Sequence, residues 1–318
     1  MRAFDYSESL GEKRNIRNAG HFMKEKSIAW SYVITHLEKI IPAHCAVCRK
    51  NAVRFLYQRW DVNYYICDDC NSIFTFVDQG IMDEYLDLEP MRELRTSDEY
   101  QTDAENRRSE IWDDLVRWIK FRTFRYTNKK DDFVVIDYAD RYRGQINKIR
   151  KSGLCRDFYL QDSILEESSG DSSGIRADIL LYLNQLQHEI NPLDTLYRLK
   201  EKIKPEGLLF LSTRLGSGFD ILTLKGGLDN IYPYEHVMLP SKKGLEFLLE
   251  KAGFELLEFL TPGTMDVQYV LENQERIDSE NLFVKQLLET DDKFIIMEFQ
   301  RLLQKAGLSS FAQIVARS

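Results

Sequence analysis

The stretch ADILLYLNQLQHEINPLDTLYRLKEKIKPEGLLFLSTR (177–214) predicts a strand, a helix and a second strand. Its apolar runs at 177–184 and 208–214 have the length of buried strands, and residues 192–204 between them carry the helical pattern. The turn PEG (205–207) separates this helix from the second run. A strand, a helix and a parallel strand in sequence form a right-handed βαβ unit. The stretch therefore predicts part of a parallel sheet with helical crossovers.

The same alternation extends in both directions along the chain. The other expected elements are a strand at 131–137, a helix at 144–153, a strand at 157–162, a helix, glycine turn and strand over 244–260, an inserted helical pair at 276–306, and a last strand at 311–318. Strands that alternate with helices are typical of an α/β fold with helices on both faces of the sheet. We expect that architecture for the C-terminal two thirds of the chain.

Four of the five cysteines form two CxxC pairs, Cys45/Cys48 and Cys67/Cys70. The β-prone segment between the pairs brings the two turns together as a hairpin, and four thiolates then match the tetrahedral pattern of zinc. Because all four positions are cysteine, no coordination position stays open for catalysis, and we expect a structural zinc ion. A redox role is the weaker alternative, since neither CxxC opens a helix after a strand. Cys155 stands alone.

Charge and composition exclude some classes of protein. Lys and Arg number 43 and Asp and Glu 51, which gives a net charge of −8 and argues against broad nucleic-acid binding. No apolar run reaches the roughly 20 residues of a membrane span, and no apolar export signal is visible. We therefore expect a cytoplasmic protein in two parts. They are an N-terminal helix with the zinc module (1–98) and an α/β domain (99–318) with a helical insertion at about 272–308.

Several segments together resemble the class I S-adenosylmethionine (SAM) dependent methyltransferases. LQHEINP (186–192) and IKPEGLLFL (203–211) are similar to the family's "LEH…P" segment and its "LkpgG" turn and strand. The segment 232–259 is similar to its "EH…kaGFe" stretch, and FAQIVARS (311–318) to its last strand. With a four-cysteine module in front, the chain resembles the sugar C-methyltransferase group. The resemblance implies a Rossmann-like sheet and methyl transfer from SAM to a carbohydrate-type or other small acceptor.

The resemblance also implies which residues hold the cofactor. The first strand ends at Asp137, and an acid after the second strand, here Asp162, takes ribose hydroxyls in nucleotide-binding folds. The positions that the resemblance assigns to the cofactor are Asp137, Ala139, Arg141, Gly144, Asp162 and Asn184. The family has glycines where this chain has Ala139, Arg141 and Arg143. Glycines let the backbone approach a ligand without a Cβ, so the loop departs from the pattern.

Three interpretations of this loop stay open. The chain binds SAM with a rearranged loop, or it has lost the cofactor and acts as a binding or scaffold protein with a protein partner. In a third variant, Arg141 and Arg143 hold a phosphate, because guanidinium groups pair bidentately with such anions.

The methyltransferase interpretation also implies a base near the acceptor. The candidates are His188, Glu235 and His236, since imidazole has the pKa for general-base work near neutral pH.

Overall fold

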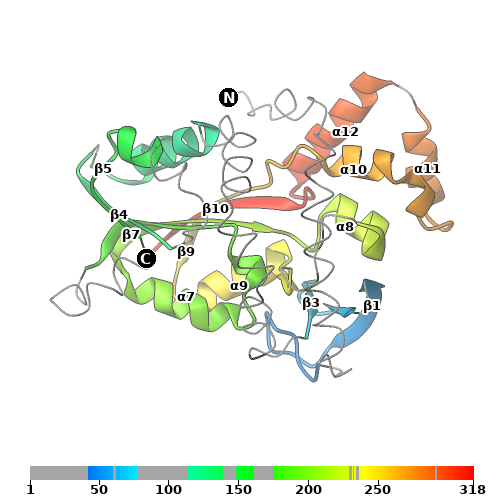
Figure 1. Cartoon of the computed structure of the whole chain (residues 1–318), viewed down its shortest axis with the longest axis horizontal. Coiled ribbons are helices and arrows are strands. Elements are labelled where there is room, and N and C mark those ends of the chain that lie inside the picture. The colour runs from blue at the N-terminus through cyan, green and yellow to red at the C-terminus, as the bar shows by residue number, and fades with distance from the viewer. Residues whose placement is uncertain are drawn as a thin grey trace, which may run out of the picture.

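The structure is a computed structural model of the chain. It describes residues 42–59, 62–76, 80, 113–129, 131–138, 148–160, 175–228, 231, 233, 236–290 and 292–318. Within these ranges two β-sheets are present, one of six strands and one of four (Figure 1). No described helix is long and apolar enough to cross a bilayer. The expected helix before the first cysteine pair lies outside the described residues.

The larger sheet has the strand order β5-β4-β6-β7-β10-β9. Its strands are β4 (Phe133–Asp137), β5 (Cys155–Leu160), β6 (Ala177–Leu183), β7 (Ile203–Arg214), β9 (Glu255–Leu260) and β10 (Phe311–Arg317). β4 is parallel to both β5 and β6, β6 is parallel to β7, and β10 runs antiparallel between β7 and β9. This mixed, mostly parallel sheet has the Rossmann-like arrangement that the resemblance predicts.

Helices cover both faces of this sheet, as expected. Residues 113–126 form a helix above the sheet in Figure 1, and α7 (Pro192–Glu201) and α9 (Lys242–Lys251) lie below it. Alternate strand residues supply the two cores, because successive side chains in a strand point to opposite faces. Ile179, Leu181 and Phe210 pack with the first helix, whereas residues such as Leu180 and Leu209 belong to the core on the other face.

Several element boundaries differ from the prediction by a few residues. β7 begins at Ile203 rather than at residue 208, and α7 ends at Glu201 rather than at residue 204. The parallel ladder explains this, because Ala177 pairs with Ile203 before the register shifts and Ile179 pairs with Leu208. The strand expected at 157–162 is β5, which begins at Cys155.

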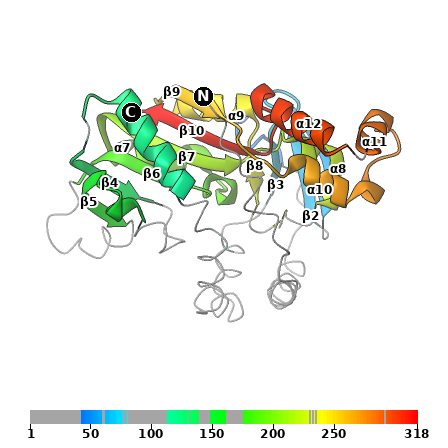
Figure 2. The same ribbon diagram turned by 90° about the horizontal axis from the view of Figure 1, so that it is seen from above.

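The described chain between β9 and β10, where an insertion is expected at about 272–308, forms a helical segment. This segment begins with α10 (Asp266–Glu272), which precedes the expected bounds, and continues with the short 3-10 helix η5 (Gln274–Arg276), α11 (Leu282–Leu288) and α12 (Lys293–Ala306). Asp266, 2 % exposed, anchors it to the sheet domain by accepting hydrogen bonds from the Ser309 hydroxyl at 2.6 Å and the Ser310 N–H at 2.6 Å. Figures 1 and 2 both place the insertion at the end of the molecule remote from β5.

The smaller sheet has the order β1-β2-β3-β8 and contains the cysteine hairpin. Its strands are β1 (Val53–Arg59), β2 (Val62–Cys67), β3 (Ile73–Thr75) and β8 (Met238–Leu239). β8 comes from the C-terminal part of the chain and pairs antiparallel with β3. Between β7 and β8 lie α8 (Phe219–Leu224) and the 3-10 helix η4 (Lys225–Gly227). The hairpin is therefore joined to the α/β part by a shared sheet.

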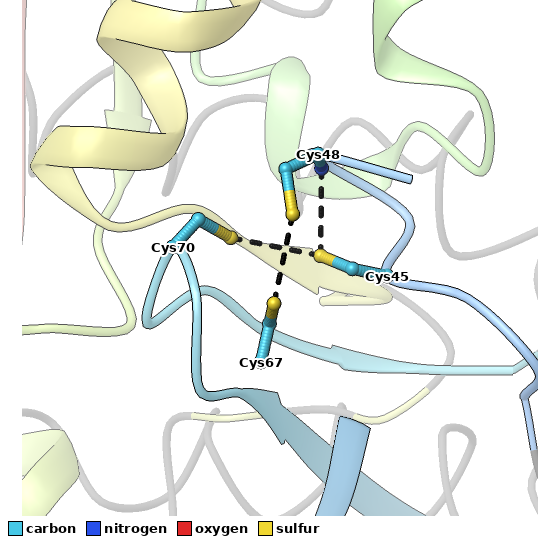
Figure 3. Close-up of side chains that lie close together, drawn as sticks. All are labelled: Cys45, Cys48, Cys67 and Cys70. Carbon is cyan, nitrogen blue, oxygen red and sulfur yellow. Dashed lines mark hydrogen bonds between the residues drawn. The ribbon is translucent and has the colours of Figure 1, made fainter. Parts of the chain in front are cut away.

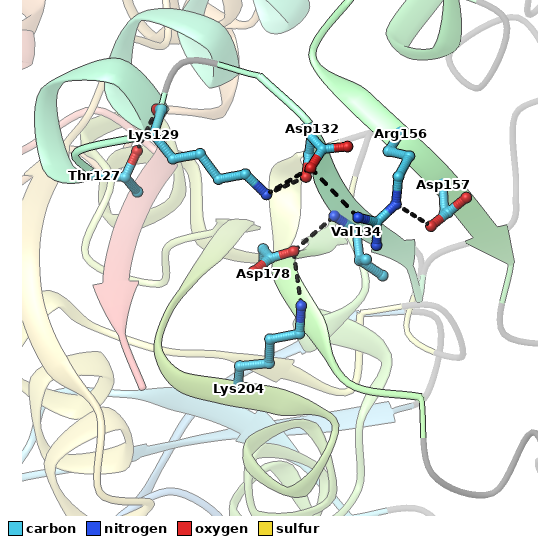
Figure 4. A network of polar contacts seen from close by, with 8 residues as sticks. All are labelled: Thr127, Lys129, Asp132, Val134, Arg156, Asp157, Asp178 and Lys204. Atoms are coloured by element: carbon cyan, nitrogen blue, oxygen red, sulfur yellow. Dashed lines mark hydrogen bonds and ion pairs between the residues drawn. The ribbon is translucent and has the colours of Figure 1, made fainter.

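An ionic network ties together the amino-terminal ends of the parallel strands (Figure 4). Asp178 on β6 accepts a hydrogen bond from the Val134 N–H at 2.8 Å and pairs with Lys204 of β7 at 2.9 Å. Burial alone would raise the pKa of Asp178, but the Val134 N–H and the Lys204 ammonium outweigh it and hold that pKa below its ordinary value. This end of the sheet is closed by structural charges, opposite the strand ends where a ligand would bind.

Candidate functional site

The four paired cysteines form one cluster of sulfur atoms (Figure 3). Cys45 Sγ lies 3.6 Å from Cys70 Sγ, and Cys48 Sγ lies 3.6 Å from Cys67 Sγ. All four Sγ atoms lie within 4.8 Å of one another, and all four residues are buried. Tetrahedral zinc with Zn–S bonds of about 2.3 Å requires sulfurs about 3.8 Å apart. The cluster is compatible with the zinc site that the CxxC spacing predicts.

The two CxxC turns share one backbone design. Arg49 and Asn71, each the residue after the second cysteine of its pair, have φ values of 61° and 60°. In both turns the N–H of this residue donates to the carbonyl of the first cysteine, at 3.0 Å for Arg49 and 2.7 Å for Asn71. The left-handed residue closes each turn so that both of its sulfurs point to one side. This repeated geometry is what a tetrahedral ion needs from two separate turns.

Backbone amides and a proton shared between sulfurs stabilise negative charge in the cluster. The N–H groups of Val47 and Cys48 donate to Cys45 Sγ at 3.3 and 3.5 Å. The hydrogen bond between Cys45 and Cys70 lowers the pKa of Cys70 to about 5 and raises that of Cys45, because one sulfur keeps the proton that the other accepts. A thiolate is the form that binds metal.

The cysteine cluster is packed directly against the segment that leads into α9. The Ser241 hydroxyl donates to the carbonyl of Cys70, and the Ser241 N–H donates to Ser72 Oγ at 3.1 Å. The same Ser241 hydroxyl accepts from the Gly244 N–H at 2.9 Å and so caps α9. A Cβ on Gly244 would lie 2.2 Å from Ser72 Oγ, so only glycine fits there. Ser241 thus connects the second CxxC turn to the start of a helix.

A second group of polar residues lies where the parallel strands end. Asp137 is the last residue of β4 and is 2 % exposed, and it pairs with Leu181 of the adjacent β6. Asn184 follows β6 with a φ of 56°, and its N–H donates to the Ser212 carbonyl at 2.8 Å. β4 lies between β5 and β6, so the order in which strands are added reverses there. In open α/β sheets, ligands bind outside the carboxyl ends of strands at such a reversal.

Two of the three predicted basic or acidic catalytic residues face each other. His188 ends the 3-10 helix η3 (Leu186–His188) that follows β6, and His236 precedes β8. Their ring centroids are 5.8 Å apart with the planes inclined by 38°. His236 is 9 % exposed, while His188 is half-buried. The structure therefore brings together two imidazoles that are 48 positions apart in the sequence.

Hydrogen bonds hold the His188 segment in place. The Gln187 amide donates to the Asn184 carbonyl at 3.0 Å and lies 3.3 Å from His188 Nε2. The carbonyl oxygen of the same amide accepts from the Thr213 hydroxyl of β7 at 2.9 Å. Gln187 thus links the ends of two strands to one imidazole. Sequence reasoning missed Gln187 and Thr213, because the bond between them spans 26 positions and neither belongs to a motif.

The remaining predicted site residues lie outside the described residues. They are Ala139, Arg141, Arg143 and Gly144 of the first loop, Asp162 after β5, and Glu235 before His236. Of the predicted cofactor and catalytic positions, the structure describes Asp137, Asn184, His188 and His236.

Comparisons with known proteins give distant structural likenesses. No family model matches the chain, and no curated protein matches it in sequence. Among solved structures, a SAM-dependent methyltransferase from Mesorhizobium loti is 11% identical, with a TM-score of 0.37 over 65% of this chain and 100% of that one. The plantazolicin methyltransferase BamL, bound to a substrate analogue and SAH, is 8% identical, with a TM-score of 0.39 over 74% and 94%. Coclaurine N-methyltransferase is 14% identical, with a TM-score of 0.37 over 63% and 72%.

Proposed function

We propose that this protein is a SAM-dependent methyltransferase that acts on a carbohydrate-type or other small-molecule acceptor. The observation that carries the proposal is the strand reversal at β4 and β6, which brings Asp137 and Asn184 to adjacent strand ends. The facing imidazoles of His188 and His236 support it, because methyl transfer to a hydroxyl or carbon acceptor also requires removal of a proton. The sugar-type acceptor rests on the sequence resemblance.

The described residues fit such a cofactor by their chemistry and position. Asp137 places a carboxylate at the strand end where the fold binds a nucleotide-type ligand. The resemblance assigns the ribose hydroxyls to Asp162, which lies outside the described residues. When bound, SAM would supply an electrophilic methyl group. His188 or His236 would accept the proton that leaves the acceptor, and the resemblance makes Glu235 a further candidate for this role.

Calorimetric titration with SAM tests this proposal. We expect saturable binding by the native chain, and weaker binding after Asp137→Ala or Asp162→Ala. The matched control is Asp157→Ala, since Asp157 lies on the neighbouring β5 and forms an exposed ion pair with Arg156 at 2.7 Å. Absence of binding at millimolar SAM would overturn the enzyme proposal and favour a fold retained for binding alone. Methyl transfer to a panel of nucleotide-linked sugars then tests the acceptor class.

We propose further that Cys45, Cys48, Cys67 and Cys70 hold one structural zinc ion. The four-sulfur donor set leaves no place for a reacting molecule, so the ion would stabilise the small sheet rather than take part in chemistry. The division at residues 98 and 99 is also a proposal. With this division, β8 belongs to the α/β part (99–318) but is a strand of the small sheet in the N-terminal part (1–98).

A further inference from the structure

Apolar side chains gather on the outer surfaces of α11 and α12. Among the described residues, seven of the thirteen strongly exposed large apolar side chains lie between residues 282 and 308. Phe283 is 74% exposed, Phe294 64% and Leu302 58%. An exposed apolar concentration of this kind on a folded protein marks an interaction surface.

α12 carries most of these side chains, and hydrogen bonds on its buried face fix its position. Gln300 is 8 % exposed, accepts from the Val267 N–H at 2.9 Å and donates to the Gly263 carbonyl at 2.8 Å. Asp292 caps the first turn through the Phe294 N–H at 2.8 Å, and Gly307 ends the helix with a φ of 74°. The outer face of α12 is therefore preorganised, which reduces the entropy lost on binding.

The most outward residues of α12 follow a spacing of four, three and four. They are Phe294, Glu298, Arg301 and Lys305, all exposed, with Glu298 and Arg301 ion-paired to each other. This spacing places them in one stripe along the helix. The stripe is symmetric about the helix midpoint between Phe299 and Gln300. An acid before the midpoint is matched by a base at the same distance after it.

We propose that α12 packs antiparallel against α12 of a second copy of this chain. A two-fold axis at the helix midpoint places Glu298 of each copy opposite Arg301 of the other, and both ion pairs form by the same contact. The same operation places Phe294 opposite Lys305, where the ammonium stacks on the ring. Along one side of the stripe, Ile295, 41% exposed, and Leu302 then face the same pair in the other copy.

The charge pattern favours a second copy over other occupants. A helix lying on a lipid surface turns a continuous apolar face to the bilayer, and here Glu298 and Arg301 interrupt that face at its centre. An unrelated partner gives no reason for acid and base to be equidistant from the midpoint. Self-pairing uses every residue of the stripe.

Sedimentation velocity of the full chain over about 1 to 100 µM tests this inference. We expect a monomer–dimer equilibrium whose dissociation constant rises at least about tenfold in Glu298→Arg and in Arg301→Glu, because each single reversal opposes like charges. The double variant Glu298→Arg/Arg301→Glu restores complementarity, and we expect its dissociation constant to return to within about threefold of the native value. All of these side chains are exposed, so the thermal midpoint of the variants should match that of the native chain at concentrations where all of them are monomeric.

The control reverses a comparable charge elsewhere. Arg117→Glu alters an exposed ion pair of the same i,i+3 spacing on helix 113–126 and should leave dimerisation intact. A native chain that stays monomeric at 100 µM overturns the inference. A dimer that survives both single reversals does so as well, and so does a monomer that floats with lipid vesicles.

Discussion

The Tyr64 hydroxyl donates a 2.9 Å hydrogen bond to the backbone carbonyl of His236, and both groups are buried. Tyr64 belongs to β2 of the cysteine hairpin, whereas His236 lies at the proposed catalytic site. The Thr75 N–H adds a bond to the carbonyl of Val237 at 2.9 Å. The hairpin that would hold zinc is therefore also the support for one of the two facing imidazoles.

We predict that Tyr64→Phe lowers the free energy of unfolding by about 1 to 2 kcal/mol, because a buried carbonyl loses its donor. If His236 acts on the acceptor, the variant should also lower kcat while the Kd for SAM stays unchanged. Urea unfolding and methyl-transfer kinetics measure the two effects. Full activity in a correctly folded Tyr64→Phe variant would show that the hairpin does not position His236 for catalysis.

Tyr57→Phe is the matched control for this substitution. Its ring stacks on Tyr64 with centroids 5.0 Å apart, and its buried hydroxyl has no hydrogen-bond partner among the described residues. Removing that hydroxyl should be neutral or slightly stabilising, because no bond is lost and a buried polar group disappears. A loss as large as in Tyr64→Phe would mean that the Tyr57 hydroxyl is itself stabilising, and the effect of Tyr64→Phe could then not be assigned to its bond with His236.

We predict about one zinc ion per chain by elemental analysis, and its loss in Cys67→Ser. Without the metal the two CxxC turns lose the ion that would join them, so hydrogen exchange should rise over β1 and β2. Cys155→Ser, which changes a thiol outside the cluster, should keep both the metal and the protection. Zinc retained at full occupancy by Cys67→Ser would refute the ligand set.

Local patterns predicted many of the elements and the cysteine cluster, whereas contacts between distant segments could not be predicted in this way. The CxxC spacing is a short-range signal, so four residues were enough to predict that these sulfurs lie together. The bond between Tyr64 and His236 spans 172 positions, and no motif contains it. β8 has only two residues and is a strand because it pairs with β3. Two residues are too few to show the alternating pattern by which a strand is predicted from the sequence. The family resemblance pointed to His188 and His236 as candidates. Only the structure shows that their rings lie close together.

Arg122 and Glu258 form a buried ion pair between the helix at 113–126 and β9. One bond of the bidentate pair measures 2.7 Å, and the side chains are only 11% and 12% exposed. We predict that Arg122→Met lowers the free energy of unfolding by about 3 kcal/mol, because Glu258 is left buried and unpaired. The double variant Arg122→Met/Glu258→Leu should lose much less unfolding free energy than the two single variants lose together.

A double-mutant cycle in urea measures this coupling. The control cycle uses Arg54 and Asp68, whose 2.7 Å pair joins side chains that are 56% and 55% exposed. We expect less than about 1 kcal/mol of coupling there, since water screens the charges. Equal coupling in the two cycles would contradict the role of burial.

Asp220 is a fully buried carboxyl group at the start of α8. Burial is the main reason that its pKa rises to about 7, and the charge of Asp266 adds to it, while Arg214 at 3.3 Å opposes it. The Ile221 N–H also donates to Asp220 at 2.8 Å, in favour of the ionised form. Between the pKa of an unfolded Asp, about 3.9, and about 7, the folded protein therefore binds a proton that the unfolded chain has released.

This difference predicts how stability depends on pH. The contribution of Asp220 is complete below about pH 4, declines as the pH rises through 7, and is constant above that. Asp220→Asn removes the titration, so its stability relative to the native chain should improve by up to a few kcal/mol between pH 5 and pH 8. Urea midpoints at several pH values measure the trend, with the exposed Asp194→Asn as control. A constant difference between Asp220→Asn and the native chain across this range would show that Asp220 is ionised throughout and that Arg214 outweighs its burial.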